Sequence, residues 1–230
     1  MSETRGAVII PTFNEGERIM AVAEAALGSS LTDEVIVVND GSQDDTADLL
    51  EKYTNDFTVL THTENRGKGE SLDTGVRYAR DQGHGNLVFL DGDLQGVDSS
   101  HVDTLLAPLE QRDVHMSIGY LGLRKTVVKK MVLNHWGALS GQRAIRSEVW
   151  DLLSDQDRRG FNVEAALNTR LRKAGMHHGI ARVALDGLGH VGKRNKAGTL
   201  PEAVWSYLKT YRAALQTYVR IELEGSTGRI

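Results

Sequence analysis

Two carboxylates that flank a single glycine give the sharpest chemical signal in this sequence. Asp91 and Asp93 follow the apolar run 86–90, and Gln95 repeats the same two-residue spacing. Such oxygens suit hard divalent cations, because Mg²⁺ or Mn²⁺ in proteins usually shares one or two carboxylates with substrate phosphates. The pattern favours a divalent metal site, and an ordinary Asp-Gly-Asp turn is the alternative.

A glycine-rich loop with positive charge precedes the acidic pair. It reads Asn65-Arg66-Gly67-Lys68-Gly69, and its backbone amides and the Lys68 ammonium are suited to meet phosphate oxygens. The loop lacks the G-x-x-x-x-G-K-[ST] pattern, and no G-x-G-x-x-G follows the first strand, so an ATPase and a dinucleotide dehydrogenase are disfavoured. The G-x-S-x-G pattern of a serine nucleophile is also absent from the sequence.

Two further polar clusters follow apolar runs nearer the N-terminus. Residues 11–15 follow the run 7–10, and residues 39–42 follow the run 34–38. In an open parallel sheet, ligands bind beyond the carboxyl ends of the strands. Four polar clusters at four strand ends therefore predict one binding site rather than four unrelated turns.

The elements that must hold these clusters alternate between strand and helix. Apolar, β-branched runs predict strands at residues 7–10, 34–38, 57–60 and 86–90. Between them, helices are predicted at residues 15–28, 44–53 and 67–80. This alternation implies an α/β fold with right-handed crossovers and a Rossmann-like, mostly parallel sheet that helices cover on both faces.

The second half of the chain is less regular. Its predicted helices cover residues 101–112, 146–154, 162–174 and 200–222, and its predicted strands cover residues 114–120 and 180–185. A basic amphipathic stretch occupies residues 124–138, and a Gly- and Lys-rich loop occupies residues 187–198. No clear linker divides the chain, so a single domain over residues 1–230 is expected.

Composition narrows the function classes. The 230 residues include no Cys, which excludes a disulfide framework, a Cys-based zinc site and a catalytic Cys. No apolar run approaches the roughly 18–20 residues that span a bilayer, and the N-terminus lacks the apolar segment of a signal peptide. A cytoplasmic protein is expected, with peripheral contact to a membrane surface as a further option.

Charge is distributed unevenly between the two halves. The net charge of −4 combines −14 over residues 1–123 with +10 over residues 124–230. This asymmetry predicts an acidic half that holds cations and a basic half that meets phosphate or an anionic membrane. Helix faces that differ by chance are the alternative. A nucleic-acid binder is disfavoured, because the acidic half would repel a phosphate backbone.

The four clusters resemble the signatures of family 2 glycosyltransferases with the GT-A fold. The strings that carry the resemblance are residues 8–15, 37–46, 65–69 and 90–95, in matching order and spacing. The form Asp-x-Asp-Leu-Gln and the later Gly141-Gln142-Arg143-Ala144-Ile145-Arg146 resemble the dolichyl-phosphate mannose synthase branch. The resemblance implies a nucleotide-sugar-binding half over residues 1–123 and an acceptor-binding half over residues 124–230.

The resemblance also implies roles around a GDP- or UDP-sugar donor. Pro11, Thr12 and Glu15 would border the nucleotide, and Asp40 would accept a hydrogen bond from the base. The full nucleotide-binding set predicted in this way is Pro11, Thr12, Asn14, Glu15, Asp40, Gly41, Ser42, Gly67, Lys68 and Asp91.

A metal ion on the diphosphate is implied as well. Asp91, Asp93 and Gln95 would hold Mg²⁺ or Mn²⁺, and His190 would complete the shell. A histidine that only supports the shell, or is merely exposed, is the alternative for His190. A divalent cation would stabilise the negative charge that develops on the leaving diphosphate.

Acceptor chemistry is assigned to the second half. Arg143 would neutralise an acceptor phosphate, and Glu164 would orient the acceptor or act as a general base. An acid that only stabilises a helix N-terminus is the alternative for Glu164. The predicted catalytic residues are thus Asp91, Asp93, Glu164 and Arg143.

The implied reaction is inverting, metal-dependent transfer of a sugar to a phosphate-bearing acceptor, with a polyprenyl phosphate favoured. Alternatives are a soluble acceptor such as a phosphorylated small acid or a glycan, a sugar-phosphate nucleotidyltransferase, and a non-catalytic binding module. Lys193, Arg194 and Lys196 are suited to clamp phosphate, with a solvated charge run as the alternative. The stretch 124–133 is the favoured membrane contact, and the apolar stripe of 200–222 fits core packing, a homodimer face or a membrane surface.

Overall fold

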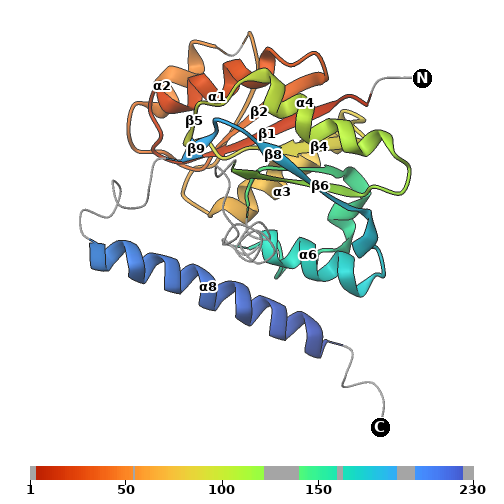
Figure 1. The fold of residues 1–230 in the computed structure, drawn as a ribbon. Helices are drawn as coiled ribbons and strands as arrows, with labels where there is room; N and C mark the ends of the chain where they lie inside the picture. Colours follow the sequence, from red (N-terminus) through yellow and green to blue (C-terminus); the bar gives the residue numbers. More distant parts are fainter. Residues whose placement is uncertain (1–3, 54, 122–139, 160–162, 191–199, 225–230) are drawn as a thin grey trace.

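The computed structural model describes residues 4–53, 55–121, 140–159, 163–190 and 200–224, with the backbone alone described for Leu121, His190 and residues 200–211. Figure 1 shows a central sheet between two layers of helices, with the long helix α8 outside them. Within these ranges, no helix is long and apolar enough to cross a membrane.

The main sheet has seven strands in the order β3-β2-β1-β4-β7-β6-β8. Its strands are β1 (Gly6–Thr12), β2 (Thr32–Asn39), β3 (Thr58–Thr61), β4 (Asn86–Phe89), β6 (Met116–Leu121), β7 (Arg143–Arg146) and β8 (Ile180–Leu185). Only β7 runs antiparallel to its neighbours among these strands. A separate antiparallel pair joins β5 (Leu94–Gln95) to β9 (Gly189–His190).

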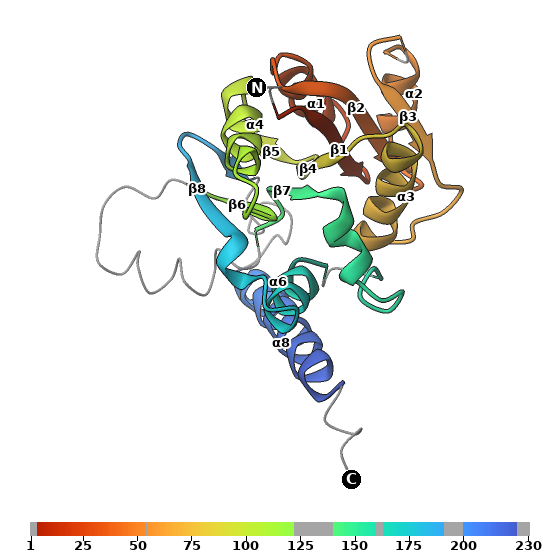
Figure 2. The ribbon, with the colours of Figure 1, turned by 90° about the vertical axis from the view of Figure 1, so that its right-hand side faces the viewer.

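Helices cover both faces of the main sheet (Figure 2). Their bounds are α1 (Arg18–Leu27), α2 (Thr46–Glu51), α3 (Lys68–Asp81), α4 (Ser99–Leu106), α6 (Val163–Lys173) and α8 (Leu200–Leu223). On one face, α1 and α4 pack against Val8 and Ile10 of β1. On the other face, α3 and α6 belong to the core that contains Ala7 and Ile9.

Strand β1 illustrates why the sheet is buried on both sides. Residues 7–10 are fully buried, and successive side chains of a strand point to opposite faces, so an unbroken apolar run serves two helix layers. The sequence pattern predicted β1 to β4, α1, α3, α6 and α8 to within a few residues. The predicted α/β fold with a mostly parallel sheet is confirmed.

The helix predicted at residues 146–154 is confirmed only in part. Residues 143–146 form the buried strand β7, and a short 3-10 helix covers Ser147–Leu152. Strand β7 lies between β4 and β6, so its pairing depends on neighbours that are distant in the sequence. Strand β7 also begins and ends with an arginine, so its sequence lacks the apolar run that predicts a buried strand. The basic stretch 124–138 and Lys193, Arg194 and Lys196 lie outside the described residues.

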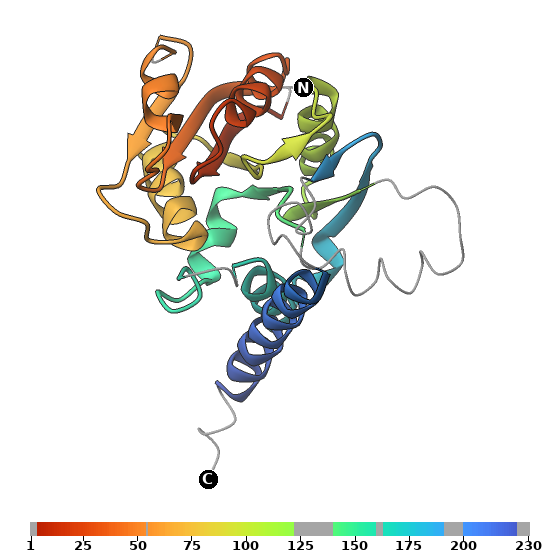
Figure 3. The same ribbon diagram turned by 90° about the vertical axis from the view of Figure 1, so that its left-hand side faces the viewer.

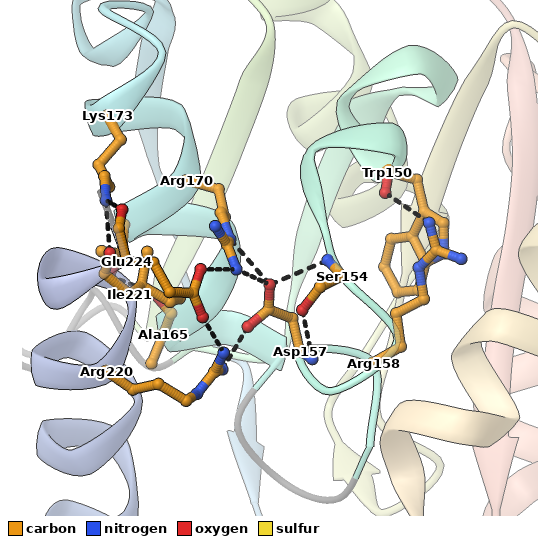
Figure 4. Close-up of polar contacts among 11 residues, drawn as sticks. Trp150, Ser154, Asp157, Arg158, Ala165, Arg170, Lys173, Arg220, Ile221 and Glu224 are labelled. Atoms are coloured by element: carbon orange, nitrogen blue, oxygen red, sulfur yellow. Dashed lines mark hydrogen bonds and ion pairs between the residues drawn. The ribbon is translucent and has the colours of Figure 1, made fainter. Parts of the chain in front are cut away.

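A buried carboxylate ties the C-terminal part of α8 to α6. Asp157 is fully buried and accepts hydrogen bonds from Arg170 of α6 and Arg220 of α8, as Figure 4 shows. Glu224 pairs with the same two arginines. At this anchored end, α8 points away from the sheet (Figure 3).

Candidate functional site

The loops that follow β1 and β2 are joined to each other by side chains. The side-chain oxygen Oδ1 of Asn14 accepts a hydrogen bond from the backbone amide of Gln43. The backbone amide of Asn14 donates to the Ser42 hydroxyl at 3.0 Å. The Thr46 hydroxyl accepts from the amides of Glu15 and Gly16. Two of the predicted polar clusters therefore lie together at one edge of the sheet.

Asp40 joins the loop after β2 to the glycine-rich loop after β3. Its carboxylate accepts from the amides of Arg66 at 2.9 Å and Gly67 at 2.7 Å, and from Nδ1 of His62 at 2.7 Å. Burial alone would raise the pKa of Asp40, but these hydrogen bonds outweigh it and hold the pKa below its usual range. The carboxylate is thus ionised and directed toward its own loop, and a contact to a nucleobase stays a prediction.

Two glycines allow this close approach. Gly41 has a φ of 70°, and a Cβ there would lie 2.5 Å from the carbonyl carbon of Glu64. Gly67 has a φ of 92° and immediately precedes α3. Both angles lie in the left-handed region that glycine adopts without a steric penalty. The sequence Gly67-Lys68 therefore turns the chain sharply into a helix that begins with a lysine.

A cavity of about 290 Å³ opens beside these loops. It is lined by Phe13, Asn39, Gly41, Ser42, Gln43, Ala47, Thr61, His62, Thr63, Glu64 and Asn65. These residues come from the segments after β1, β2 and β3, which is where ligands bind to open parallel sheets. Its volume is near the lower end of the range for small-molecule sites.

Lys68 lies at the centre of the charged part of the site. Its ammonium contacts Oδ1 of Asp91 at 2.6 Å and Oε1 of Glu164 at 2.6 Å. Burial would lower the pKa of Lys68, but the two carboxylates outweigh it and raise the pKa above its usual value. Residues predicted separately from the first and second halves of the sequence are therefore brought together around one cation.

Gln142 and Gly141 complete the surroundings of Asp91. The Gln142 side chain is buried, and its Nε2 donates to Oδ2 of Asp91 at 2.8 Å. A Cβ at Gly141 would lie 2.5 Å from Oδ2 of Asp91 and 2.6 Å from Nζ of Lys68. Only a residue without a side chain leaves room for this contact, so Gly141 allows Asp91 and Lys68 to meet the segment before β7.

Arg143, which was predicted to neutralise phosphate near the acceptor, is a buried residue. It is 1% exposed, and its guanidinium donates to the Ser140 carbonyl at 2.7 Å and to Oδ1 of Asn168 at 2.9 Å. Burial lowers the pKa of Arg143 to about 10, although Glu164 and Asp91 act in the opposite direction. The charge therefore lies inside the protein, near Glu164 and Asp91, and the predicted role of Arg143 at an acceptor phosphate stays a prediction.

The residues predicted to hold a metal are only partly gathered. Within the described part of the chain, no group of three or more acids and histidines is arranged to hold a metal ion. Asp93 is half-buried, Gln95 is exposed, and the backbone of His190 pairs with Leu94, one residue from Asp93. The side chain of His190 lies outside the described atoms, so its role stays a prediction.

One buried atom beside the acidic pair suits a bound polar group. Oγ1 of Thr12 is buried and has no hydrogen-bond partner among the described residues. A Cβ at Gly92 would lie 3.3 Å from it. Because a buried hydroxyl without a partner costs free energy, an orphaned oxygen at the Asp91–Asp93 turn favours a ligand there. Mg²⁺ takes one or two carboxylates plus phosphate oxygens, which Asp91 and Asp93 fit.

Sequence reasoning missed two residues of this site. His62 immediately follows β3. The polar cluster predicted after that strand started three residues later, at Asn65, whereas a cluster that started at the end of the strand would have included His62. Gln142 lies within the string that includes Arg143, but only tertiary contact shows that it holds Asp91. Among the other predicted residues, Pro11 is half-buried at the end of β1.

Known protein sequences resemble this chain. The sequence model described as Glycosyl transferase family 2 matches residues 7–170. A cholesterol galactosyltransferase of Borreliella burgdorferi is 27% identical over 72% of this chain and 47% of its own length. A dolichyl-phosphate beta-glucosyltransferase of Drosophila melanogaster is 34% identical over 49% of this chain and 39% of its own. The chain thus spans less than half the length of these two relatives.

Solved structures share the fold. Glucosyl-3-phosphoglycerate synthase of Mycobacterium tuberculosis, in complex with Mn²⁺, UDP and glucosyl-3-phosphoglycerate, matches with a TM-score of 0.69. The match covers 96% of this chain and 79% of that one at 22% identity. The same enzyme with Mn²⁺, UDP-glucose and glycerol 3-phosphate gives a TM-score of 0.66. At this identity, the likeness shows a common architecture.

Proposed function

The chain belongs to glycosyl transferase family 2 and has the GT-A fold, and from this membership we propose that it transfers a sugar from a nucleotide-diphosphate donor to a phosphate-bearing acceptor. The observation that carries the proposal is the bridge from Lys68 to Asp91 and Glu164. It joins the nucleotide-side loops to α6 at the edge of the sheet where substrates bind.

In the proposed site, the nucleoside lies in the cavity after β1, β2 and β3, and the diphosphate lies toward Asp91 and Asp93. UDP in the complex of the structurally similar synthase supports a nucleotide donor. Asp91 and Asp93, with His190 as a further candidate, would hold Mg²⁺ or Mn²⁺. When bound, the ion supplies positive charge that stabilises the departing diphosphate.

The chain's own residues then orient the sugar and balance charge. Transfer breaks the bond between the anomeric carbon and the diphosphate, and the electron pair stays on the diphosphate. An oxygen of the acceptor phosphate forms the new bond on the opposite face of the sugar, which inverts the anomeric centre. That phosphate is already anionic and needs no general base, so Glu164 keeps its bond to Lys68 and orients the sugar.

Arg143 contributes from behind this pair. Its buried positive charge faces Glu164 and Asp91, which lie nearer the substrate. We propose that it keeps the two carboxylates ionised and in place, since a buried cation favours the charged form of a nearby acid.

The Lys68→Met variant tests the bridge. Methionine keeps the length and packing of the side chain but leaves Asp91 and Glu164 without their shared cation. We expect the kcat/KM for sugar transfer to fall about a hundredfold, the effect of removing one preorganised charge-stabilising donor. Steady-state kinetics with the nucleotide sugar measures this, and circular dichroism checks that the fold is retained.

Lys52→Met is the matched control, because Lys52 is exposed at the end of α2 and lies outside the bridge. It should leave kcat/KM unchanged. A Lys68→Met enzyme that works at the wild-type rate would show that the bridge only supports the fold.

A polyprenyl phosphate is the acceptor that we favour. The curated relatives include enzymes whose names specify dolichyl phosphate and cholesterol, both lipids. The surplus of +10 over residues 124–230 suits a phosphate group and an anionic membrane. We therefore propose peripheral contact with a membrane surface, which salt should weaken because exposed charges are screened over about 8–10 Å.

A soluble phosphorylated acid is the second candidate. It is supported by the synthase of similar fold, whose complexes include phosphoglyceric acid and glycerol 3-phosphate.

One experiment separates the acceptors. The purified chain receives a radiolabelled UDP- or GDP-sugar together with a polyprenyl phosphate in vesicles and 3-phosphoglycerate in solution. We expect the label in the product that organic solvent extracts. Label in the aqueous glycoside would replace the lipid by the soluble acid, and no product with either acceptor would refute the proposed transfer.

A further inference from the structure

His62 is a buried histidine that lines the cavity proposed for the nucleoside and has no step of its own in the proposed reaction. It follows β3, its side chain is 6% exposed, and both ring nitrogens are bonded. Nδ1 contacts Oδ1 of Asp40 at 2.7 Å, and Nε2 contacts the Thr74 hydroxyl at 2.9 Å. Since the Asp40 carboxylate can only accept, Nδ1 is the nitrogen that carries the proton.

These two bonds link the end of a strand to the helix that carries Lys68. Asp40 accepts from His62 and from the amides of Arg66 and Gly67, the last two residues before α3. Thr74 lies on α3 itself, in the second turn. One imidazole therefore braces both the loop that enters α3 and the body of α3.

The position of Lys68 depends on this bracing. Lys68 is the first residue of α3, and its ammonium must reach Asp91 and Glu164 at the same time. Because its neighbour Gly67 has little intrinsic preference for one backbone conformation, the loop needs an external constraint. The fixed carboxylate of Asp40 supplies that constraint, and His62 fixes the carboxylate.

We propose that His62 is a positioning residue of this site, which holds Lys68 in its bridge to Asp91 and Glu164 through Asp40 and Thr74. The proposal rests on the proposed function in one respect, since it assigns the bridge a part in sugar transfer. The statement that His62 holds Lys68 in place concerns geometry alone and can be tested without an activity assay.

Two substitutions separate the two bonds of His62. Asparagine places an amide nitrogen near the position of Nδ1, so His62→Asn keeps the hydrogen bond to Asp40 and loses the hydrogen bond to Thr74. Glutamine reaches the position of Nε2, so His62→Gln keeps Thr74 and loses the donor to Asp40. His84→Asn and His84→Gln are matched controls, because His84 also pairs with a carboxylate, Glu34, at 2.9 Å and lies outside the site.

We expect His62→Gln to lower kcat for sugar transfer about 10–100-fold, as is typical when a partner of a site residue is removed. The KM for the nucleotide sugar should change less than kcat, and His62→Asn should restore most of the rate. Two readouts need no activity: amide hydrogen exchange at Arg66 and Gly67, and labelling of Lys68 by a succinimidyl ester. Both should speed up in His62→Gln and stay near wild type in His62→Asn and the His84 variants.

The proposal would be overturned if His62→Gln kept the wild-type rates of amide exchange at Arg66 and Gly67, of Lys68 labelling, and the wild-type kcat. So would equal losses in His62→Asn, His62→Gln and the His84 variants, which would indicate a general loss of stability. If the wild-type chain transfers no sugar, the proposed function fails, while exchange and labelling still decide whether His62 holds the loop of Lys68.

Discussion

The Asp93→Asn variant is expected to lose about a thousandfold in the rate of sugar transfer, because it removes a carboxylate that would hold the divalent cation. A metal ion at a developing negative charge is worth several kcal/mol, and about 4 kcal/mol corresponds to a factor of 1,000. Asparagine has nearly the same shape, so the fold should persist. Steady-state kinetics over a titration of Mn²⁺ measures the loss, and high Mn²⁺ should recover part of the rate.

The control for this variant is Asp45→Asn. Asp45 is exposed at the same edge of the sheet and caps α2 without a side-chain hydrogen bond. Its substitution should leave the metal titration unchanged. Full activity of the wild-type enzyme in excess chelator would contradict the assignment of a metal site.

The Asp157→Ala variant should destabilise the fold by about 3–5 kcal/mol, the usual cost of breaking a buried ion pair. Asp157 is fully buried between Arg170 and Arg220, so its removal leaves two guanidinium groups that share Glu224. Chemical denaturation measures the free energy of unfolding. The same experiment on Asp155→Ala is the control, because Asp155 lies two residues away with a side chain that is 86% exposed. The control should change stability by less than about 0.5 kcal/mol.

The effect of Asp157 should also depend on pH. Burial alone would raise the pKa of Asp157, but hydrogen bonds from Arg220, Ser154 and Arg170 hold it below its usual value. The stabilisation is therefore complete well above the unfolded pKa of about 3.9 and disappears as the pH falls through the lower folded pKa. Wild-type and Asp157→Ala stabilities should converge in acid and separate toward neutral pH. A constant difference at all pH values would show that lost packing, rather than lost charge, causes the destabilisation.

The first half of the fold was predictable because its signals are local. The apolar run of β1 and the polar residues 11–15 after it lie next to each other in the sequence, and the same holds for β2 and residues 39–42. Parallel strands bring their carboxyl ends to one edge, so the meeting of the Asn14 and Ser42 loops followed from strand order alone.

The remainder depended on tertiary contacts that no local pattern encodes. Lys68 and Glu164 are 96 positions apart, and nothing near either residue indicates that they share a hydrogen bond. The role of Arg143 near an acceptor phosphate was predicted from the family resemblance. Strand β7 places Arg143 between β4 and β6, where Asn168 and the Ser140 carbonyl accept its hydrogen bonds, and no local pattern indicates this burial. The surplus of basic residues in the second half is therefore partly internal.

The fate of the donor's phosphates tests the central claim most directly. Phosphorus NMR of the purified chain with a UDP- or GDP-sugar, Mg²⁺ and a phosphate-bearing acceptor distinguishes which bond breaks. Sugar transfer predicts a nucleoside diphosphate in amounts equal to the glycosylated acceptor, formed about a thousandfold more slowly in Asp93→Asn. Release of a nucleoside triphosphate or monophosphate, or a donor that remains intact with every acceptor, would contradict it.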